Sequence, residues 1–324
     1  MPMTCTRNTS TQQYRLPKRR LFRLHSVLCF LLALALSFPG AALASSVPTS
    51  IRVAMVTSPT TEMYPLKIMD RDLLSLTNLV YESLVVLNDS REPDYGLATD
   101  WKTTSDNRTW TFTLREGVRF HDGLELTAYD VAATMDAIKA NAGDLEKAPT
   151  AENGMYANTA RVCKSWSVEG RYTLTVQTDR PSSLLYAMNF PVLQAQSLSM
   201  PNPPGTGPYR MVQYSPGEEL WLVGNQNWYG AAPYISEIIG VWYENYDAAL
   251  RAFEAEDVDI VMTRSTSAVK YRGTSSSRIN SYDYSTRQLE CLLINSAIRD
   301  LNNTDMRQAI AYALNKTRLI SGVY

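Results

Sequence analysis

Two neighbouring segments decide the fold: residues 110–120, with the sequence WTFTLREGVRF, and residues 126–131, with the sequence LTAYDV. The first five residues of the former alternate apolar and polar side chains, which is the period of a strand with one buried face. In the latter, Thr127 and Asp130 are three residues apart, the spacing of a capping box at the start of a helix. The two patterns predict an α+β unit, which we assign to residues 88–200.

A boundary follows this unit. Residues 201–208 (PNPPGTGP) contain four prolines and two glycines, which restrict or break regular structure. After it the pattern predicts a second unit, with parallel strands and a covering helix. The expected elements are a strand at 51–56, an amphipathic helix over 73–84, a hairpin at 209–214 and 219–223, a strand at 238–243, a helix at 247–254 and a strand at 258–262.

The first 44 residues are typical of a cleavable signal peptide. Basic residues at 18–20 and 23 precede an apolar run over 27–38, and Ala42-Leu43-Ala44, with small residues at 42 and 44, follows. This run is shorter than the about 20 apolar residues of a membrane span. We expect cleavage between Ala44 and Ser45 and release into a periplasm. The pair Arg19-Arg20 also resembles a twin-arginine signal, but ordinary secretion of the unfolded chain is favoured.

Composition excludes several classes of function. Removal of residues 1–44 takes away six basic and no acidic residues, so the formal net charge changes from −1 to −7. An acidic chain predicts neither nucleic acid nor anionic lipid as a partner. One histidine, His121, remains, too few for a His-rich metal site. We expect no metal, no cofactor and no catalytic residue, with His121 in a structural turn and with Cys163 and Cys291 as separate buried thiols.

Several motifs occur together in a fixed order. They are residues 81–84 (YESL), 97–131 around WTFTLREGVRFHDG, 205–209 (GTGPY), 257–260 (DVDI) and 305–310 (DMRQAI). Together they resemble the extracytoplasmic solute-binding proteins, family 5, of ABC importers for peptides, dipeptides, oligopeptides and nickel. The resemblance covers essentially all of the chain after the leader.

The resemblance implies a mixed α/β clamshell of the class II periplasmic-binding-protein type, with a base subdomain built from residues 45–87 and 201–283 and with residues 88–200 inserted into it. Solute binds between two lobes, and closure presents a new surface to permease subunits in the inner membrane. Family members continue with a second lobe and a returning segment, so we expect this chain to be an N-terminal part, with 284–324 as the start of lobe 2. The expected solute is a short peptide, and the expected state is a monomer.

Three alternatives remain open. One is a truncated remnant without ligand function. Another is a secreted hydrolase, which would need His121 as its base. A nickel solute is less favoured because only one histidine remains, although nickel can be carried by a chelator.

The resemblance also points to ligand-binding residues. Met69, Asp70 and Arg71 follow the first strand and are expected to face the cleft, as are Met262 and Thr263 after the motif at 257–260.

Two other features bear on the fold. Glu256 stands where the family's helix usually ends on glycine, so we expect a different cap there. A helix with an apolar face is expected near residues 304–314, with little to pack against.

Overall fold

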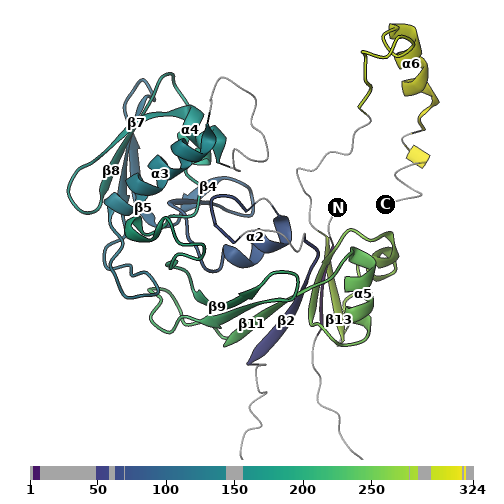
Figure 1. Ribbon diagram of the computed structural model, residues 1–324, viewed down its shortest axis with the longest axis horizontal. Helices are drawn as coiled ribbons and strands as arrows, with labels where there is room; N and C mark the ends of the chain where they lie inside the picture. Colours follow the sequence, from purple (N-terminus) through teal and green to yellow (C-terminus); the bar gives the residue numbers. More distant parts are fainter. Residues whose placement is uncertain are drawn as a thin grey trace, which may run out of the picture.

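The chain is a mixed α/β protein built around two β-sheets (Figure 1). The computed structural model describes residues 3–7, 49–57, 63–68, 70–143, 156–276, 278–283, 293–315 and 317–318. The larger sheet has seven strands in the order β13-β1-β12-β2-β11-β10-β9. In that order the strands are Ile279–Asp283, Met3–Arg7, Ile260–Thr263, Ser50–Met55, Glu237–Trp242, Glu219–Gly224 and Tyr209–Ser215.

The centre of the large sheet is parallel. Strand β2 pairs in parallel with β11 on one side and with β12 on the other. Helix α5 (Tyr246–Glu254) connects β11 to β12, so the predicted βαβ unit is confirmed, with β2 inserted between its two strands. The apolar face of α5 buries Phe253 against Ala54 and Val261. On the other side of the sheet, helix α2 (Arg71–Thr77) packs Leu76 next to Gly240.

Helix α2 is shorter than the apolar spacing predicts. It ends at Thr77, and the chain beyond it bonds to a distant segment instead: Gly207 N donates to Val80 O (2.9 Å) and Tyr209 N donates to Leu79 O (3.0 Å). A Cβ on Gly207 would lie 2.3 Å from Leu79 O. Positions 205 and 207 therefore lie in a close-packed crossover where only glycine fits, and this contact overrides the helical pattern.

The smaller sheet is antiparallel, with the order β5-β6-β8-β7. The alternation predicted for β6 is confirmed, and so is the capping box, in which Thr127 N donates to Asp130 Oδ2 (2.8 Å). Residues 118–120 form no strand; Arg119 only makes an isolated bridge with Glu125. The elements of this part are β3 (Val85–Leu87), β4 (Pro93–Tyr95), β5 (Ala98–Thr103), β6 (Thr109–Leu114), α3 (Ala128–Ala142), α4 (Ala157–Val162), β7 (Cys163–Val168), β8 (Thr173–Thr178), η2 (Leu184–Ala187) and η3 (Ala195–Ser197).

The two sheets share one hydrophobic core. A continuous cluster of buried side chains extends from Val53 of β2, through Phe112 of β6 and Phe190, to Leu222 of β10. The proline-rich segment at 201–208 is thus a change of sheet rather than a break in packing. The division into a base and an inserted subdomain stays a prediction about folding units.

The end of helix α5 corrects one expectation. Glu256 has φ of 70°, so a non-glycine residue adopts the left-handed conformation that the family's glycine would take. Asp257 N donates to Ala252 O (2.9 Å), a bond typical of a left-handed helix end. The prediction of a different cap is wrong, and the conformation costs about 1–2 kcal/mol relative to glycine.

Both ends of the chain differ from the rest. Residues 3–7 lie in the large sheet as β1, whereas we expected all of residues 1–44 to lie outside the fold. Helix α6 (Thr304–Ala313) lies apart from the sheets and buries none of its described residues, and Tyr312 is 88% exposed. The expected helix is confirmed, and its apolar face is unpacked. Cys291 lies outside the described residues, and Cys163 is a free, buried thiol.

Candidate functional site

The carboxyl ends of three parallel strands meet at one edge of the large sheet. Trp242 of β11 lies opposite Met55 of β2, and Val261 of β12 lies opposite Ala54. From this edge β2 continues toward α2 on one face, while β11 continues into α5 on the other. An edge at which helices leave on opposite faces is a topological switch point, where open α/β sheets bind ligands.

Side-chain and backbone hydrogen bonds fix the backbone at this edge. The carboxylate of Asp72, which is 4% exposed, accepts a hydrogen bond from Val56 N (2.9 Å) at the end of β2. Tyr243 N donates to Met55 O (2.8 Å), and Asn245 caps α5 by accepting from Ala248 N (2.8 Å). The loops that leave β2 and β11 are therefore held to one another and to the helices that follow.

The first group of predicted site residues comprises Met69, Asp70 and Arg71, and the structure describes only part of it at this edge. Met69 and the side chain of Arg71 lie outside the described residues. Asp70 is the N-cap of α2, and its Oδ1 accepts from Leu73 N (2.9 Å). Because that bond uses one carboxylate oxygen, Asp70 has a structural role whether or not it also meets a ligand.

The second group lies at the end of β12. Met262 is half-buried, whereas Thr263 is 1% exposed and its Oγ1 accepts from Ser265 N (3.0 Å). Ser265 in turn caps the 3₁₀-helix η4 (Thr266–Tyr271) and donates its hydroxyl to Asp247. Ligand contact by either predicted residue remains a prediction.

Sequence reasoning missed the polar residues that order the edge. Asn245 and Ser265 each directly precede a helical segment that follows a strand, which is the N-cap pattern. That signal was present in the sequence. The partner of Asp72 was not readable, because its hydrogen bond to Val56 spans 16 residues that carry no local pattern.

His121 is a structural bridge. Gly205 N donates to its Nδ1 (3.3 Å), so Nε2 carries the proton and donates to Gly207 O (3.0 Å). Burial lowers the pKa of the ring, and the nearby positive charge of Arg210 lowers it further. Both ring nitrogens of His121 are therefore bound to the backbone of the crossover.

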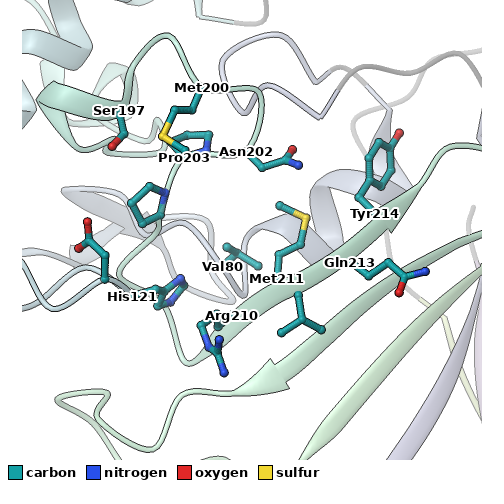
Figure 2. A pocket seen from close by; sticks show the side chains of 13 residues that line it. Val80, His121, Ser197, Met200, Asn202, Pro203, Arg210, Met211, Gln213 and Tyr214 are labelled. Carbon is teal, nitrogen blue, oxygen red and sulfur yellow. The ribbon is translucent and has the colours of Figure 1, made fainter.

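A cavity of about 390 Å³ lies beside this bridge, between the proline-rich segment and β9 (Figure 2). His121 lies at one end and Tyr214 at the other, with Met200 and Met211 between them. The Tyr214 ring lies 5.7 Å from the ring of Trp242, whose strand ends at the site edge. The cavity therefore extends along the sheet toward the switch point.

The half-buried carboxyl group of Glu82 connects the same crossover to the smaller sheet. Tyr229 Oη donates to Glu82 Oε1 (2.7 Å), and the guanidinium of Arg115 lies 4.9 Å from the centre of the Tyr229 ring. Burial raises the pKa of Glu82, while its neighbours Tyr229, Thr206, Trp228 and Arg115 oppose that rise. This cluster joins residues from both sides of the 201–208 segment.

Two kinds of chemistry find no support among the described residues. No group of three or more His, Cys, Asp or Glu lies close enough together to hold a metal ion. Lys270, which forms a Ser-x-x-Lys pattern with Ser267, is paired with Glu254 at 2.7 Å. Within the same residues, no helix has the length and apolar character needed to cross a membrane.

Residues 92–324 match the family model described as bacterial extracellular solute-binding proteins, family 5 Middle. The chain belongs to this family. Its members are binding proteins rather than enzymes, and the recognised motifs and the periplasmic-binding-protein type of fold are confirmed.

Two curated relatives come from Escherichia coli. A probable D,D-dipeptide-binding periplasmic protein is 24% identical, over 90% of this chain and 58% of its own length. A dipeptide-binding protein is 26% identical, over 71% of this chain and 47% of its own length. The chain thus spans about half the length of these relatives.

Solved structures share the fold. The periplasmic binding protein DppA of Helicobacter pylori, in complex with the peptide STSA, matches with a TM-score of 0.66 and 20% identity, over 85% of this chain and 58% of its own. NikZ of Campylobacter jejuni, in complex with Ni(L-His), matches with a TM-score of 0.67 and 19% identity, over 85% and 55%. At this identity the likeness concerns architecture alone.

Proposed function

We propose that this chain is the solute-capturing component of an ABC importer and that its solute is a short peptide. The observation that carries the proposal is the switch-point edge of β2, β11 and β12 in a chain of this family. Relatives named as dipeptide-binding or peptide-binding support the peptide class. In this proposal the solute lies on the edge and a second lobe closes over it.

The chemistry of the edge suits an extended peptide. The described side chains of Asp70, Asp72 and Thr263 accept hydrogen bonds from backbone N–H groups of the protein. Main-chain groups and half-buried side chains such as Met262 and Tyr243 remain to meet a solute. Recognition through main-chain hydrogen bonds gives affinity for a peptide backbone while tolerating different side chains.

The export of the chain belongs to the same proposal. We infer that residues 1–44 are cleaved after Ala44, that the product acts in the periplasm as a monomer, and that inner-membrane permease subunits receive the solute. Relatives named as periplasmic support this compartment. N-terminal sequencing of chain recovered from a periplasmic extract would test the cleavage site, and a start at Ser45 is expected.

The peptide assignment can be tested by thermal melting with defined di- to pentapeptides, because a ligand that binds only the folded state raises the midpoint. Glu244→Trp places a bulky ring at the carboxyl end of β11, where Glu244 is exposed. Glu237→Trp makes the same change at the amino end of the same strand. We expect peptides to raise the midpoint of the unsubstituted chain and of Glu237→Trp but not of Glu244→Trp.

Two other results would contradict parts of this proposal, either the kind of solute or the place where it binds. A rise with Ni(L-His) and none with any peptide would replace the peptide by a metal chelate as the solute. Equal peptide-dependent rises in Glu244→Trp and Glu237→Trp would place the binding site away from the switch-point edge.

A further inference from the structure

The cavity beside His121 has no part in the proposed function. Its volume of about 390 Å³ is within the range of small-ligand sites, roughly 300–1,000 Å³. Residues 210–214 of β9 form one wall, and the proline-rich segment forms the other (Figure 2). Because consecutive residues of a strand point to opposite faces, a cavity that touches all five runs along the outer edge of β9, the last strand of the large sheet.

The middle of this cavity is apolar. Met211 extends into it from β9, and Met200 lies on the opposite side next to Pro203 (Figure 2). Met200 is 48% exposed and Val212 is 46% exposed, so apolar surface on the cavity wall is in contact with water. Methionine side chains are flexible and polarisable, and they adapt to apolar groups of different shapes. The apolar body of a ligand would remove this surface from water, which favours binding.

Hydrogen bonds within the protein hold both walls in place. Tyr81 Oη donates to Pro203 O (2.9 Å) in the core. His121 bonds to Gly205 N and to Gly207 O, where the proline-rich segment leads into β9. The walls are therefore fixed before a ligand arrives, which lowers the entropic cost of binding.

A positive charge lies at the His121 end of the cavity. The wall carries two charged residues, Asp122 and Arg210. Asp122 accepts from Gln194 Nε2 (2.8 Å) and from Leu124 N (3.1 Å), so each of its carboxylate oxygens has a donor within the protein. None of the ion pairs among the described residues includes Arg210, which lies beside His121 (Figure 2). A guanidinium group matches a carboxylate through two parallel N–H···O bonds.

We propose that this cavity binds a small monocarboxylic acid with an apolar body. The carboxylate pairs with Arg210 at the His121 end, and the apolar body lies between Met200 and Met211. A carboxylate alone would gain only an exposed ion pair, which contributes little in water. The proposal involves neither the switch-point edge nor a peptide, so it stands or fails separately from the proposed function.

Equilibrium dialysis of the purified chain with labelled phenylacetate tests the site. Phenylacetamide has the same apolar body without the charge, and Arg210→Gln removes the charge from the protein. We expect saturable binding of phenylacetate, and about fivefold weaker binding when either charge is removed, because an exposed ion pair contributes up to about 1 kcal/mol. Arg180→Gln is the matched control, because Arg180 is exposed but does not line the cavity, and it should bind phenylacetate like the unsubstituted chain.

Two further arms locate the ligand. An excess of acetate should not displace phenylacetate, because acetate has no apolar body. Glu244→Trp, at the carboxyl end of β11, should leave phenylacetate binding unchanged. The proposal is overturned by a lack of saturable binding, by equal affinity for phenylacetamide, by unchanged binding in Arg210→Gln, by displacement with acetate or by loss of binding in Glu244→Trp. The comparison of phenylacetate with phenylacetamide uses the unsubstituted chain, so it does not depend on the folding of any variant.

Discussion

The bridge made by His121 leads to the sharpest prediction. In His121→Phe the ring is kept, but Gly205 N loses the acceptor Nδ1 and Gly207 O loses the donor Nε2. Gly207 O keeps a hydrogen bond from Asn225 Nδ2 (3.1 Å), whereas no other described acceptor is bonded to Gly205 N. Leaving one buried N–H unpaired costs about 1–3 kcal/mol, and the second lost bond adds about 0.5–1.5 kcal/mol.

The same bridge makes stability depend on pH. Burial lowers the pKa of His121 in the folded state below its ordinary value of 6.5, so the unfolded chain takes up a proton first on acidification. The bridge therefore stabilises fully above about pH 6.5, and its contribution is lost as pH falls through the lowered pKa of the folded state. A protonated Nδ1 would also face the Gly205 N–H donor to donor. Glu82, whose pKa is raised by burial above its ordinary value of 4.5, changes stability in the opposite direction.

Urea unfolding followed by tryptophan fluorescence at pH 7.5 and at pH 5.5 measures both effects. We expect His121→Phe to lose about 1.5–4.5 kcal/mol at pH 7.5, and to lose less further stability than the unsubstituted chain on going to pH 5.5. The sequence has one other histidine, at position 25 in the expected leader. An unchanged unfolding free energy at pH 7.5, or parallel pH profiles in the two proteins, would refute the bridge.

Three further predictions concern stability and reactivity. Glu256→Gly should raise the unfolding free energy by up to about 1 kcal/mol, because glycine relieves a strain of about 1–2 kcal/mol at φ 70° but loses roughly 0.5–1 kcal/mol more backbone entropy on folding. Ala255→Gly should not raise it, and equal effects of the two changes on the melting midpoint would contradict this. Gly207→Ala should destabilise by at least about 1–3 kcal/mol, because its Cβ would lie 2.3 Å from Leu79 O, whereas Gly224→Ala, with contacts of 3.6 Å, should be tolerated; similar urea midpoints would rule out the close approach. Cys163, whose thiol pKa burial raises to about 12, should resist iodoacetamide in the native chain and react in urea, and rapid native labelling detected by mass spectrometry would show that it is accessible.

Predictions from local patterns in the sequence are the ones that the structure confirms. The alternation in β6 and the capping box of α3 are confirmed because both signals arise within a few residues and agree with the burial that follows. The helix predicted over 73–84 failed beyond Thr77 because residues more than 120 positions away, Gly207 and Tyr209, bond to the backbone at Leu79 and Val80. No periodicity within a segment carries that information.

The pairing of strands that lie far apart in the chain could not be predicted from the sequence, for the same reason. The βαβ pattern predicts β11 and β12 in one sheet, but it does not indicate that β2, almost 200 positions earlier, lies between them. Nor does any leader pattern predict a strand at residues 3–7, because the strand forms only where β12 and β13 leave room for it. Strand order is decided by which edges remain unpaired, and that is a property of the assembled sheet.

The resemblance to the family does not show which side chains of the candidate site already have hydrogen-bond partners within the protein. It points to two loops that belong to the carboxyl edge of one sheet, but the described side chains of Asp70 and Thr263 are already engaged by Leu73 N and Ser265 N. A side chain that caps a helix or a turn is held in place by that bond, so it orders the loop before any solute arrives. A solute at this edge then meets a backbone that is already positioned, which lowers the entropic cost of binding. This arrangement favours recognition of the main chain of a peptide over recognition of one particular side chain.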